Sequence, residues 1–279
     1  MREIKVADIQ KKVAEMLLDA CQNIPENVLC RLNQAKDEEE SPLGKEVIDR
    51  IIQNDILARE KHLPICQDTG VVVCFLEVGY DVHFDGDVYQ AINEAVSQAY
   101  TLGYLRKSVV KDPLIRENTN DNTPGIIHYE IISGDKIEIT VAPKGFGSEN
   151  MSRVFMLKPA DGEEGVKNAI LTAVKDAGPN ACPPMVVGVG VGGTFEKCAL
   201  MAKKALTRPV NTHSDIEWVK DMEIEMLEKI NKTGIGPGGL GGSTTALAVN
   251  INTYPTHIAG LPVAINICCH VNRHAVRVL

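Results

Sequence analysis

The chain has 279 residues, of which 44% are hydrophobic, so it can bury one large core or two smaller ones. Its 29 basic and 37 acidic side chains give a net charge of -8, and the Lys and Arg residues are scattered, which argues against a nucleic-acid partner. No run approaches the roughly 18 apolar residues that a membrane span needs. Residues 1–5 lack the apolar core of a signal peptide. We therefore expect a cytoplasmic protein without a membrane partner.

Helices dominate the expected N-terminal part of the chain, about residues 1–62. Apolar residues recur at helical spacing over the first 20-odd positions, with Cys21 near the end of this pattern, and Cys30 follows in a second apolar patch. Both thiols are expected in the core. Residues 38–40 are three glutamates that we expect to be solvated, and Ser41-Pro42 supplies an N-cap and a first-turn proline for the next helix.

The middle of the chain combines strands with a long polar segment. Residues 71–76 are β-rich and apolar, which predicts a buried strand, and residues 87–102 have the spacing of a helix that ends at a glycine. Residues 106–125 contain too many turn residues for a regular element, and ordered polar loops of this length often bind ligands. Residues 126–132 and 136–141 alternate around a turn and predict a hairpin.

Two later loops carry groups that could face a ligand. Gly145 and Gly147 follow the second strand of that hairpin and would let backbone N–H groups approach a ligand closely. A helix is expected over about residues 163–177, and Cys182 comes directly after it on a proline-rich, rigid loop. Residues 214–217 read as a capping box that opens another helix.

Gly188, Gly190 and Gly193 match the spacing of a dinucleotide-binding fingerprint between a strand-like run and a helix. A second strand ending in an acidic residue about 20 positions later is missing, because the chain there contains Thr207-Arg208-Pro209. Glycines that let a helix pack closely on a strand are the alternative. An NAD-dependent oxidoreductase therefore remains a secondary hypothesis.

Cysteine spacing restricts the possible metal sites. None of the eight cysteines forms a Cys-x-x-Cys pair, so a metal site must be assembled from distant segments. Zinc at Cys268-Cys269-His270 with His274 is a weak alternative, because neighbouring cysteines rarely both turn inward. The more economical grouping takes one cysteine from each of three loops, namely Cys66, Cys182 and Cys269. Three thiolates on an iron–sulfur cluster leave one iron open to a substrate oxygen.

The loop of residues 63–70 places a thiol, an amide and a carboxylate side by side at Cys66, Gln67 and Asp68. A proline before them and a glycine after them favour a tight loop on which the three groups can converge. Asp68 could instead supply only turn hydrogen bonds, with Cys66 as a buried apolar residue.

These motifs resemble those of a known family. Residues 64–70, residues 181–184 followed by Gly188-Val189-Gly190, and His257 ahead of Cys269 are similar to the three cysteine motifs of iron–sulfur-dependent hydro-lyases, the class I fumarases and L-tartrate dehydratases. The resemblance covers essentially the whole chain. Three further segments look more like fumarase than tartrate dehydratase, namely residues 108–114, 118–124 and 144–150. The resemblance implies one catalytic domain over residues 1–279, with a mixed α/β (α+β) fold in which helices pack around small β-sheets and the cluster-binding loops converge.

The resemblance also implies a cofactor and a set of site residues. Cys66, Cys182 and Cys269 would hold a [4Fe-4S] cluster whose fourth iron binds malate. The other implied residues are the catalytic Asp68 and His257 and the substrate-binding Gln67, Arg106, Gly145 and Gly147. Arg106 offers a bidentate fork for a dicarboxylate, and Asp68 could hold or relay a proton.

The expected activity is reversible hydration of fumarate to L-malate by an alpha subunit. Fused relatives carry a second domain after the cluster-binding part, so we expect a separate beta subunit that supplies the base and the rest of the active site, in a hetero-oligomer. The main alternative is an L-tartrate or other 2-hydroxy-diacid dehydratase alpha subunit. A non-catalytic cluster-binding subunit is a further alternative from another class.

Overall fold

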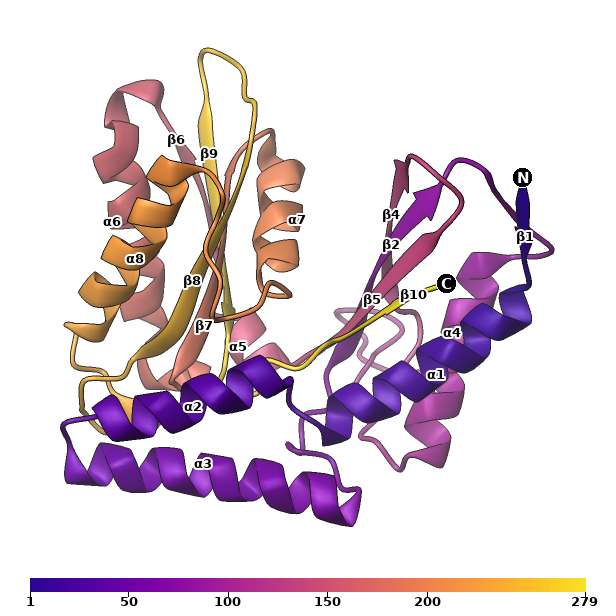
Figure 1. Cartoon of the computed structure of the whole chain (residues 1–279), viewed down its shortest axis with the longest axis horizontal. Coiled ribbons are helices and arrows are strands. Elements are labelled where there is room, and N and C mark those ends of the chain that lie inside the picture. Colours follow the sequence, from indigo (N-terminus) through magenta and orange to yellow (C-terminus); the bar gives the residue numbers. More distant parts are fainter. The chain divides into compact units, whose positions relative to one another are not determined.

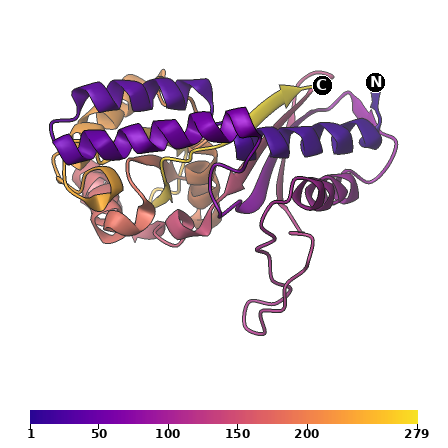
Figure 2. The same cartoon turned by 90° about the horizontal axis from the view of Figure 1, so that it is seen from below.

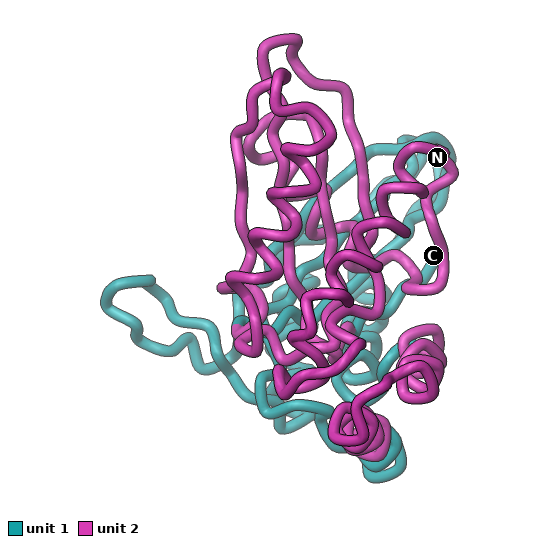
Figure 3. The backbone as a smooth tube through the Cα atoms, turned by 90° about the vertical axis from the view of Figure 1, so that its left-hand side faces the viewer, with its two compact units in different colours: residues 1–25, 55–146, 273–279 teal, residues 26–54, 147–272 magenta.

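The computed structural model describes residues 1–279 and confirms the mixed α/β class. The chain forms two compact units (Figure 3), of which unit 1 comprises residues 1–25, 55–146 and 273–279 and unit 2 comprises residues 26–54 and 147–272. The helices are α1 (Val6–Gln22), α2 (Glu26–Glu38), α3 (Pro42–Lys61), α4 (Val88–Leu102), α5 (Phe146–Glu149), α6 (Gly162–Ala177), α7 (Phe195–Ala205) and α8 (Glu217–Asn231). The strands are β1 (Arg2–Ile4), β2 (Val71–Gly79), β3 (Val82–Phe84), β4 (Ile126–Ile132), β5 (Ile137–Lys144), β6 (Arg153–Leu157), β7 (Met185–Gly192), β8 (Ala246–Tyr254), β9 (Leu261–Cys268) and β10 (Ala275–Val278). The assignment of residues 1–279 to one catalytic domain stays a prediction.

Unit 1 is built around a four-stranded sheet with the order β10-β5-β2-β4 (Figure 1). Its core is formed by the apolar faces of α1 and α4 against β2 and β5, with Leu17, Ile92 and Ile139 among the fully buried side chains. The helical spacing in the N-terminal sequence is thereby explained, because that face of α1 is buried. A short parallel pair, β1 with β3, lies outside this sheet.

The predicted hairpin is wrong. β2 lies between the two strands, pairing in parallel with β4 and antiparallel with β5. The turn after β4 therefore connects strands that are not hydrogen-bonded neighbours. The strongly apolar β2 is covered along both edges by a neighbouring strand in this arrangement. A turn sequence between β4 and β5 carries no information about that third strand.

Unit 2 is a three-layer structure around the sheet β6-β9-β7-β8. Figure 1 shows α6 and α8 on one face of this sheet and α7 on the other. Val166 of α6 and Met226 of α8 belong to the main core, whereas Cys198 of α7 packs with Met201 and Ala264 on the opposite face. Cys198 is therefore a structural core residue.

The glycines of the fingerprint pack a helix on a strand. A Cβ atom at Gly188 would lie 2.2 Å from the carbonyl oxygen of Ala202, and one at Gly190 would lie 2.0 Å from that of Cys198. Both oxygens belong to the backbone of α7, so no side chain fits at either position. The close approach of β7 and α7 thus explains this glycine pattern without a dinucleotide.

The N-terminal helical part departs from expectation at two residues. Cys30 on α2 is exposed and is not a core residue. Glu39 is buried rather than solvated, at 1% exposure. Its carboxylate accepts hydrogen bonds from the backbone N–H groups of Ser243 (2.8 Å) and Thr244 (2.7 Å), which accounts for its burial and holds its pKa below the usual value.

The N-cap predicted at Ser41 is confirmed, and the structure shows a further one at Asp87. Ser41 Oγ accepts from the Gly44 N–H at 3.2 Å, and Asp87 Oδ1 accepts from the Gln90 N–H at 3.1 Å. The capping box at residues 214–217 is wrong. α8 begins at Glu217 with Ile216 at the N-cap, and the Ser214 hydroxyl accepts from the Ile216 N–H instead (3.2 Å).

The polar segment that precedes β4 extends away from the sheet and helices of unit 1 (Figure 2). As predicted, it has no helix or strand, and a single bridge joins Val110 to Asn118. Asp112 Oδ1 accepts from the N–H groups of Leu114 and Ile115, both at 2.8 Å, which orders the tip of this segment. No helix of the chain has the length and apolar character needed to cross a membrane.

Candidate functional site

The loop that carries Cys66 is fixed by main-chain hydrogen bonds in unit 1. The Ile65 N–H donates to the Cys21 carbonyl at 2.9 Å. On the other side of the loop the buried Tyr100 hydroxyl donates to the carbonyls of Thr69 (2.6 Å) and Gly70 (3.1 Å). These contacts leave Cys66 half-buried at the surface of the unit. The interpretation of Cys66 as a buried apolar residue is therefore wrong.

Asp68 presents a carboxylate whose orientation is set by two backbone donors. Oδ1 accepts from the Gly70 N–H at 2.9 Å, and Oδ2 accepts from the Phe146 N–H at 2.8 Å. A Cβ atom on Gly145 would lie 3.2 Å from Oδ2, so a side chain there would crowd the carboxylate. The Gly145 loop thus contacts Asp68 directly, and Asp68 makes the predicted turn hydrogen bond as well.

Arg106 lies beside the same loop through its backbone. Its carbonyl accepts from Thr69 Oγ1 at 2.9 Å, while its side chain is exposed. Asn122 connects both segments, because its side-chain oxygen accepts from the Ser108 N–H (2.7 Å) and its amide donates to the Gly70 carbonyl (3.1 Å). Unit 1 therefore brings together the segments that carry Asp68, Arg106 and Gly145, and Gln67 is exposed on the same loop.

Cys182 and Cys269 come together in unit 2. Cys182 precedes β7 and Cys269 follows β9, and the antiparallel register of Val186 with Cys268 puts both at one end of the sheet. The backbone N–H of His270 donates to the Cys182 carbonyl at 3.4 Å, and its ring Nδ1 lies 3.0 Å from the same oxygen. Because a carbonyl only accepts, this contact requires the Nδ1–H tautomer.

Cys182 adopts a left-handed backbone conformation with φ 51° and ψ 65°. This conformation is unfavourable for a residue other than glycine and marks positions that the surrounding structure over-determines. Its thiol is exposed, and Cys269 is half-buried. The two thiols are thus presented at the surface of unit 2 by backbone contacts that do not depend on either sulfur.

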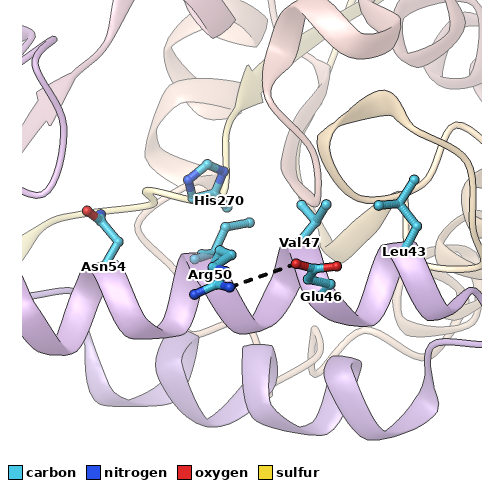
Figure 4. Close-up of a pocket in the computed structure, with 7 residues that line it drawn as sticks. Leu43, Glu46, Val47, Arg50, Asn54 and His270 are labelled. Atoms are coloured by element: carbon cyan, nitrogen blue, oxygen red, sulfur yellow. Dashed lines mark ion pairs between the residues drawn. The ribbon is translucent and has the colours of Figure 1, made fainter.

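A cavity of about 420 Å³ lies between His270, the residue after Cys269, and helix α3 (Figure 4). His270 lines it from one side, and α3 lines it from the other through Leu43, Val47 and Ile51 together with Glu46, Arg50 and Asn54. Arg50 and Glu46 lie 3.8 Å apart, as an ion pair along the helix. The residue after Cys269 is therefore accessible from solvent.

His257 lies at the other end of the sheet in unit 2. It follows β8, whose last residue pairs with Gly192 at the far end of β7, whereas Cys182 and Cys269 lie before β7 and after β9. At about 3.3 Å per residue, the length of β9 separates His257 from Cys269 by roughly 25 Å. The structure therefore does not bring His257 to the cysteine pair of its own chain. Its exposed side chain instead lines a mostly apolar cavity of about 490 Å³ that includes Trp218 and Met222.

The cysteines differ in the accessibility of their thiols. Cys66, Cys182 and Cys269 are at least partly accessible, as is Cys30 on α2, whereas Cys21, Cys74, Cys198 and Cys268 are buried. Burial raises the pKa of the Cys21 thiol to about 11 and that of Cys74 to about 12, so these stay protonated and are poor metal ligands. Cys268 is buried in β9 beside the half-buried Cys269, which disfavours the zinc alternative.

The donor set therefore fits a cluster in its chemistry, because three accessible thiols come from three loops. Two of the three, Cys182 and Cys269, are neighbours in unit 2, and Cys66 belongs to unit 1. No group of three or more His, Cys, Asp or Glu side chains in the structure could hold a metal ion.

Sequence reasoning considered His270 only as a zinc ligand and missed Arg273. In unit 2 His270 contacts the Cys182 loop, and in unit 1 Arg273 donates through Nη2 to the Asp68 carbonyl and through Nε to the Pro143 carbonyl (3.0 Å). The two residues follow Cys269 by one and four positions. Each reaches its partner through a long-range contact that has no local pattern.

Comparison of the sequence with known proteins identifies the family of the chain. The sequence model of the family described as fumarate hydratase (Fumerase) matches residues 10–278. A Methanocaldococcus jannaschii protein with the provisional name L(+)-tartrate dehydratase subunit alpha is 41% identical over 281 residues, covering 98% of this chain and 97% of that protein. The L(+)-tartrate dehydratase alpha subunits of Escherichia coli strain K12 and Shigella sonnei are each 30% identical over 253 residues, covering 90% of this chain and 84% of those proteins. The chain belongs to the fumarate hydratase (Fumerase) family.

Proposed function

We propose that this chain is the alpha subunit of an iron–sulfur hydro-lyase that hydrates fumarate reversibly to L-malate. Membership of the fumarate hydratase family supports the reaction class, and the names of the relatives support the subunit assignment. The observation that carries the proposal is the meeting of Cys182 and Cys269, far apart in the sequence, at one end of the sheet in unit 2.

Cys66, Cys182 and Cys269 would hold a [4Fe-4S] cluster. Such a cluster, with one iron lacking a thiolate, supplies a Lewis acid for a substrate oxygen. The chain's own contribution is to present the thiols on loops fixed by main-chain contacts, namely Ile65 with Cys21 and His270 with Cys182. Preorganised ligands lower the conformational cost of binding the cofactor.

Asp68, Arg106 and Gln67 would act on the substrate. The exposed Arg106 guanidinium offers two parallel N–H donors for a substrate carboxylate. The Asp68 carboxylate is held by two backbone N–H groups, and each oxygen retains a further lone pair with which it can hold a proton. Gln67, exposed between Cys66 and Asp68, supplies an amide for the hydroxyl or the second carboxylate. We propose Gly145 and Gly147 as backbone contacts of the substrate. Gly145 lies beside the Asp68 carboxylate, and Gly147 lies in the first turn of α5, whose first residue donates to that carboxylate.

We propose His257 as a catalytic residue that acts in the active site of another chain. Because it lies at the other end of β9 from Cys269, it would act at a site formed with another chain. Mixing an inactive His257→Asn protein with an inactive Cys182→Ser protein tests this idea. Recovery of activity in mixed oligomers supports action in another chain, and activity that stays absent contradicts it.

The beta subunit is proposed from the relatives' names, since each is called an alpha subunit. The beta chain would supply the base that removes the proton from the carbon next to the C–O bond. We expect a hetero-oligomer that forms from separately purified chains, with hydro-lyase activity only in the mixture. Full activity of this chain alone would contradict the requirement.

A second substrate, L(+)-tartrate, is supported by the printed names of the relatives. The test is an anaerobic comparison of kcat/KM for L-malate and L(+)-tartrate with the reconstituted complex. A higher value for L-malate supports the proposal, whereas a higher value for tartrate assigns the enzyme to the second candidate. No elimination of water from either diacid, with the cluster loaded, would contradict the proposed function.

A further inference from the structure

Arg273 is a buried guanidinium four residues after Cys269. It is 5% exposed and lies two residues before the start of β10, which pairs with β5 in unit 1. Its Nε donates to the carbonyl of Pro143, near the end of β5, at 3.0 Å, and its Nη2 donates to the carbonyl of Asp68. One side chain therefore links the loop that carries Cys66, Gln67 and Asp68 to the strand end that leads into Gly145.

The energetics of this burial favour a specific role. Moving a charged group out of water is strongly unfavourable unless hydrogen bonds compensate, and a neutral side chain of similar length would avoid that penalty. Arginine offers what such a side chain lacks, namely Nε and Nη donors in one rigid plane. The two carbonyls that accept from Arg273 belong to segments far apart in the sequence, so the plane fixes their separation.

The Arg273 guanidinium holds the backbone on both sides of the hydrogen bond between Phe146 and Asp68. Asp68 Oδ2 accepts from the Phe146 N–H, and Phe146 lies two residues after the end of β5. Nη2 of Arg273 holds the backbone of Asp68, and Nε holds the strand end that precedes Phe146. If the guanidinium is lost, nothing else in this set of contacts fixes the Asp68 carbonyl.

We infer that Arg273 is a positioning residue that sets the Asp68 carboxylate against the Gly145 loop, an inference that rests on the proposed function for its catalytic consequence. Arg273 touches the backbone of the site and no reacting atom. Substitution is expected to loosen the loops of residues 63–70 and 143–147 while the remaining structure persists. A shift of the order of 1 Å in a catalytic group can lower a rate about 100-fold.

The test compares Arg273→Met, which loses the fork and the charge, with Arg273→Lys, which keeps the charge and one donor. Arg277→Met is the matched control, because Arg277 lies four positions later, on β10, with an exposed side chain that is 3.9 Å from Asp19. The primary measurement is amide hydrogen exchange by mass spectrometry on the full chain without the cluster. Peptides over residues 63–72 and 143–149 report on the N–H groups of Gly70 and Phe146, which donate to Asp68.

We expect exchange in these two peptides to be about tenfold faster or more in Arg273→Met, intermediate in Arg273→Lys and unchanged in Arg277→Met, with α6 unaffected in every protein. In the reconstituted complex, kcat should fall by about 10- to 100-fold in Arg273→Met at equal iron content and be partly restored in Arg273→Lys. Unchanged exchange in both peptides, or an equal increase throughout the chain, would overturn the inference. The exchange comparison needs no substrate, so a lack of hydro-lyase activity in the unmodified complex counts against the proposed function alone.

Discussion

Replacing Gly190 with alanine tests whether the glycine pattern of β7 serves packing. The added Cβ atom would lie 2.0 Å from the Cys198 carbonyl oxygen and 2.9 Å from the Ala202 nitrogen, both in the backbone of α7. An ordinary contact of about 3.4 Å or more would require α7 to move by about 1.4 Å from a sheet whose interior is close-packed. Overpacking costs about 1–3 kcal/mol in flexible surroundings, and we expect about 3 kcal/mol here because backbone has to shift.

Urea unfolding followed by circular dichroism measures this loss. Gly260→Ala is the control, because the nearest atoms to its Cβ would be 3.9 Å away in the same unit. With a denaturant slope of about 3 kcal/mol per molar, the expected loss lowers the midpoint of Gly190→Ala by about 1 M, whereas the control should change little. Equal stability of the two variants would refute the packing explanation, and NADH binding that Gly190→Ala abolishes would favour the dinucleotide hypothesis instead.

Three further predictions follow from single contacts. His270→Leu should lose iron to a chelator about tenfold faster than the parent protein. His270→Asn, whose amide can still donate to the Cys182 carbonyl, should lose iron at close to the parent rate. Equal rates in the two variants would contradict the role of this contact. Burial raises the pKa of Asp55 to about 7, so the folded state holds a proton that the unfolded chain releases, and stability should fall by about 2–4 kcal/mol as the pH rises from about 4 to 7. Urea midpoints at pH 5 and 8 should converge in Asp55→Asn, and a pH dependence that persists would refute this. Arg106→Lys should raise KM for the diacid by about tenfold or more through loss of the bidentate fork, and an unchanged KM in steady-state assays would contradict substrate binding there.

Local patterns in the sequence predicted most individual elements. The apolar face of α1, the N-cap of α3 at Ser41 and the strand β2 each follow from spacing or residue type within one segment. Pairing could not be predicted in the same way. The alternation around the turn after β4 is real, yet β2 lies between the strands, because the choice of neighbours depends on burial across the whole sheet.

Buried polar contacts also escaped prediction where the partner is distant. Glu39 has the sequence context of a solvated charge, and only the backbone N–H groups at Ser243 and Thr244 make its burial favourable. Cys30 has apolar neighbours along the chain but lies on the exposed side of α2.

At the candidate site the motifs identified accessible thiols and the Asp68 loop, because glycine, proline and cysteine at fixed offsets constrain a loop locally. They could not give relative positions. His257 lies twelve positions before Cys269, yet the turn between β8 and β9 puts the full length of a strand between them. No motif predicts the contacts of His270 and Arg273, since their partners are the carbonyls of Cys182, Pro143 and Asp68, which are distant in the sequence.

The most direct test of the account is an EPR spectrum of the anaerobically reconstituted chain before and after mild oxidation, with Cys66→Ser, Cys182→Ser and Cys269→Ser for comparison. Cys30→Ser is the matched control, because Cys30 is also exposed but lies outside the predicted ligand set. We predict a three-iron signal on oxidation that is lost in each of the three variants and retained in the control, as expected for a cluster with one labile iron. No iron–sulfur signal under any condition, or a signal that survives in the three variants, would contradict the account.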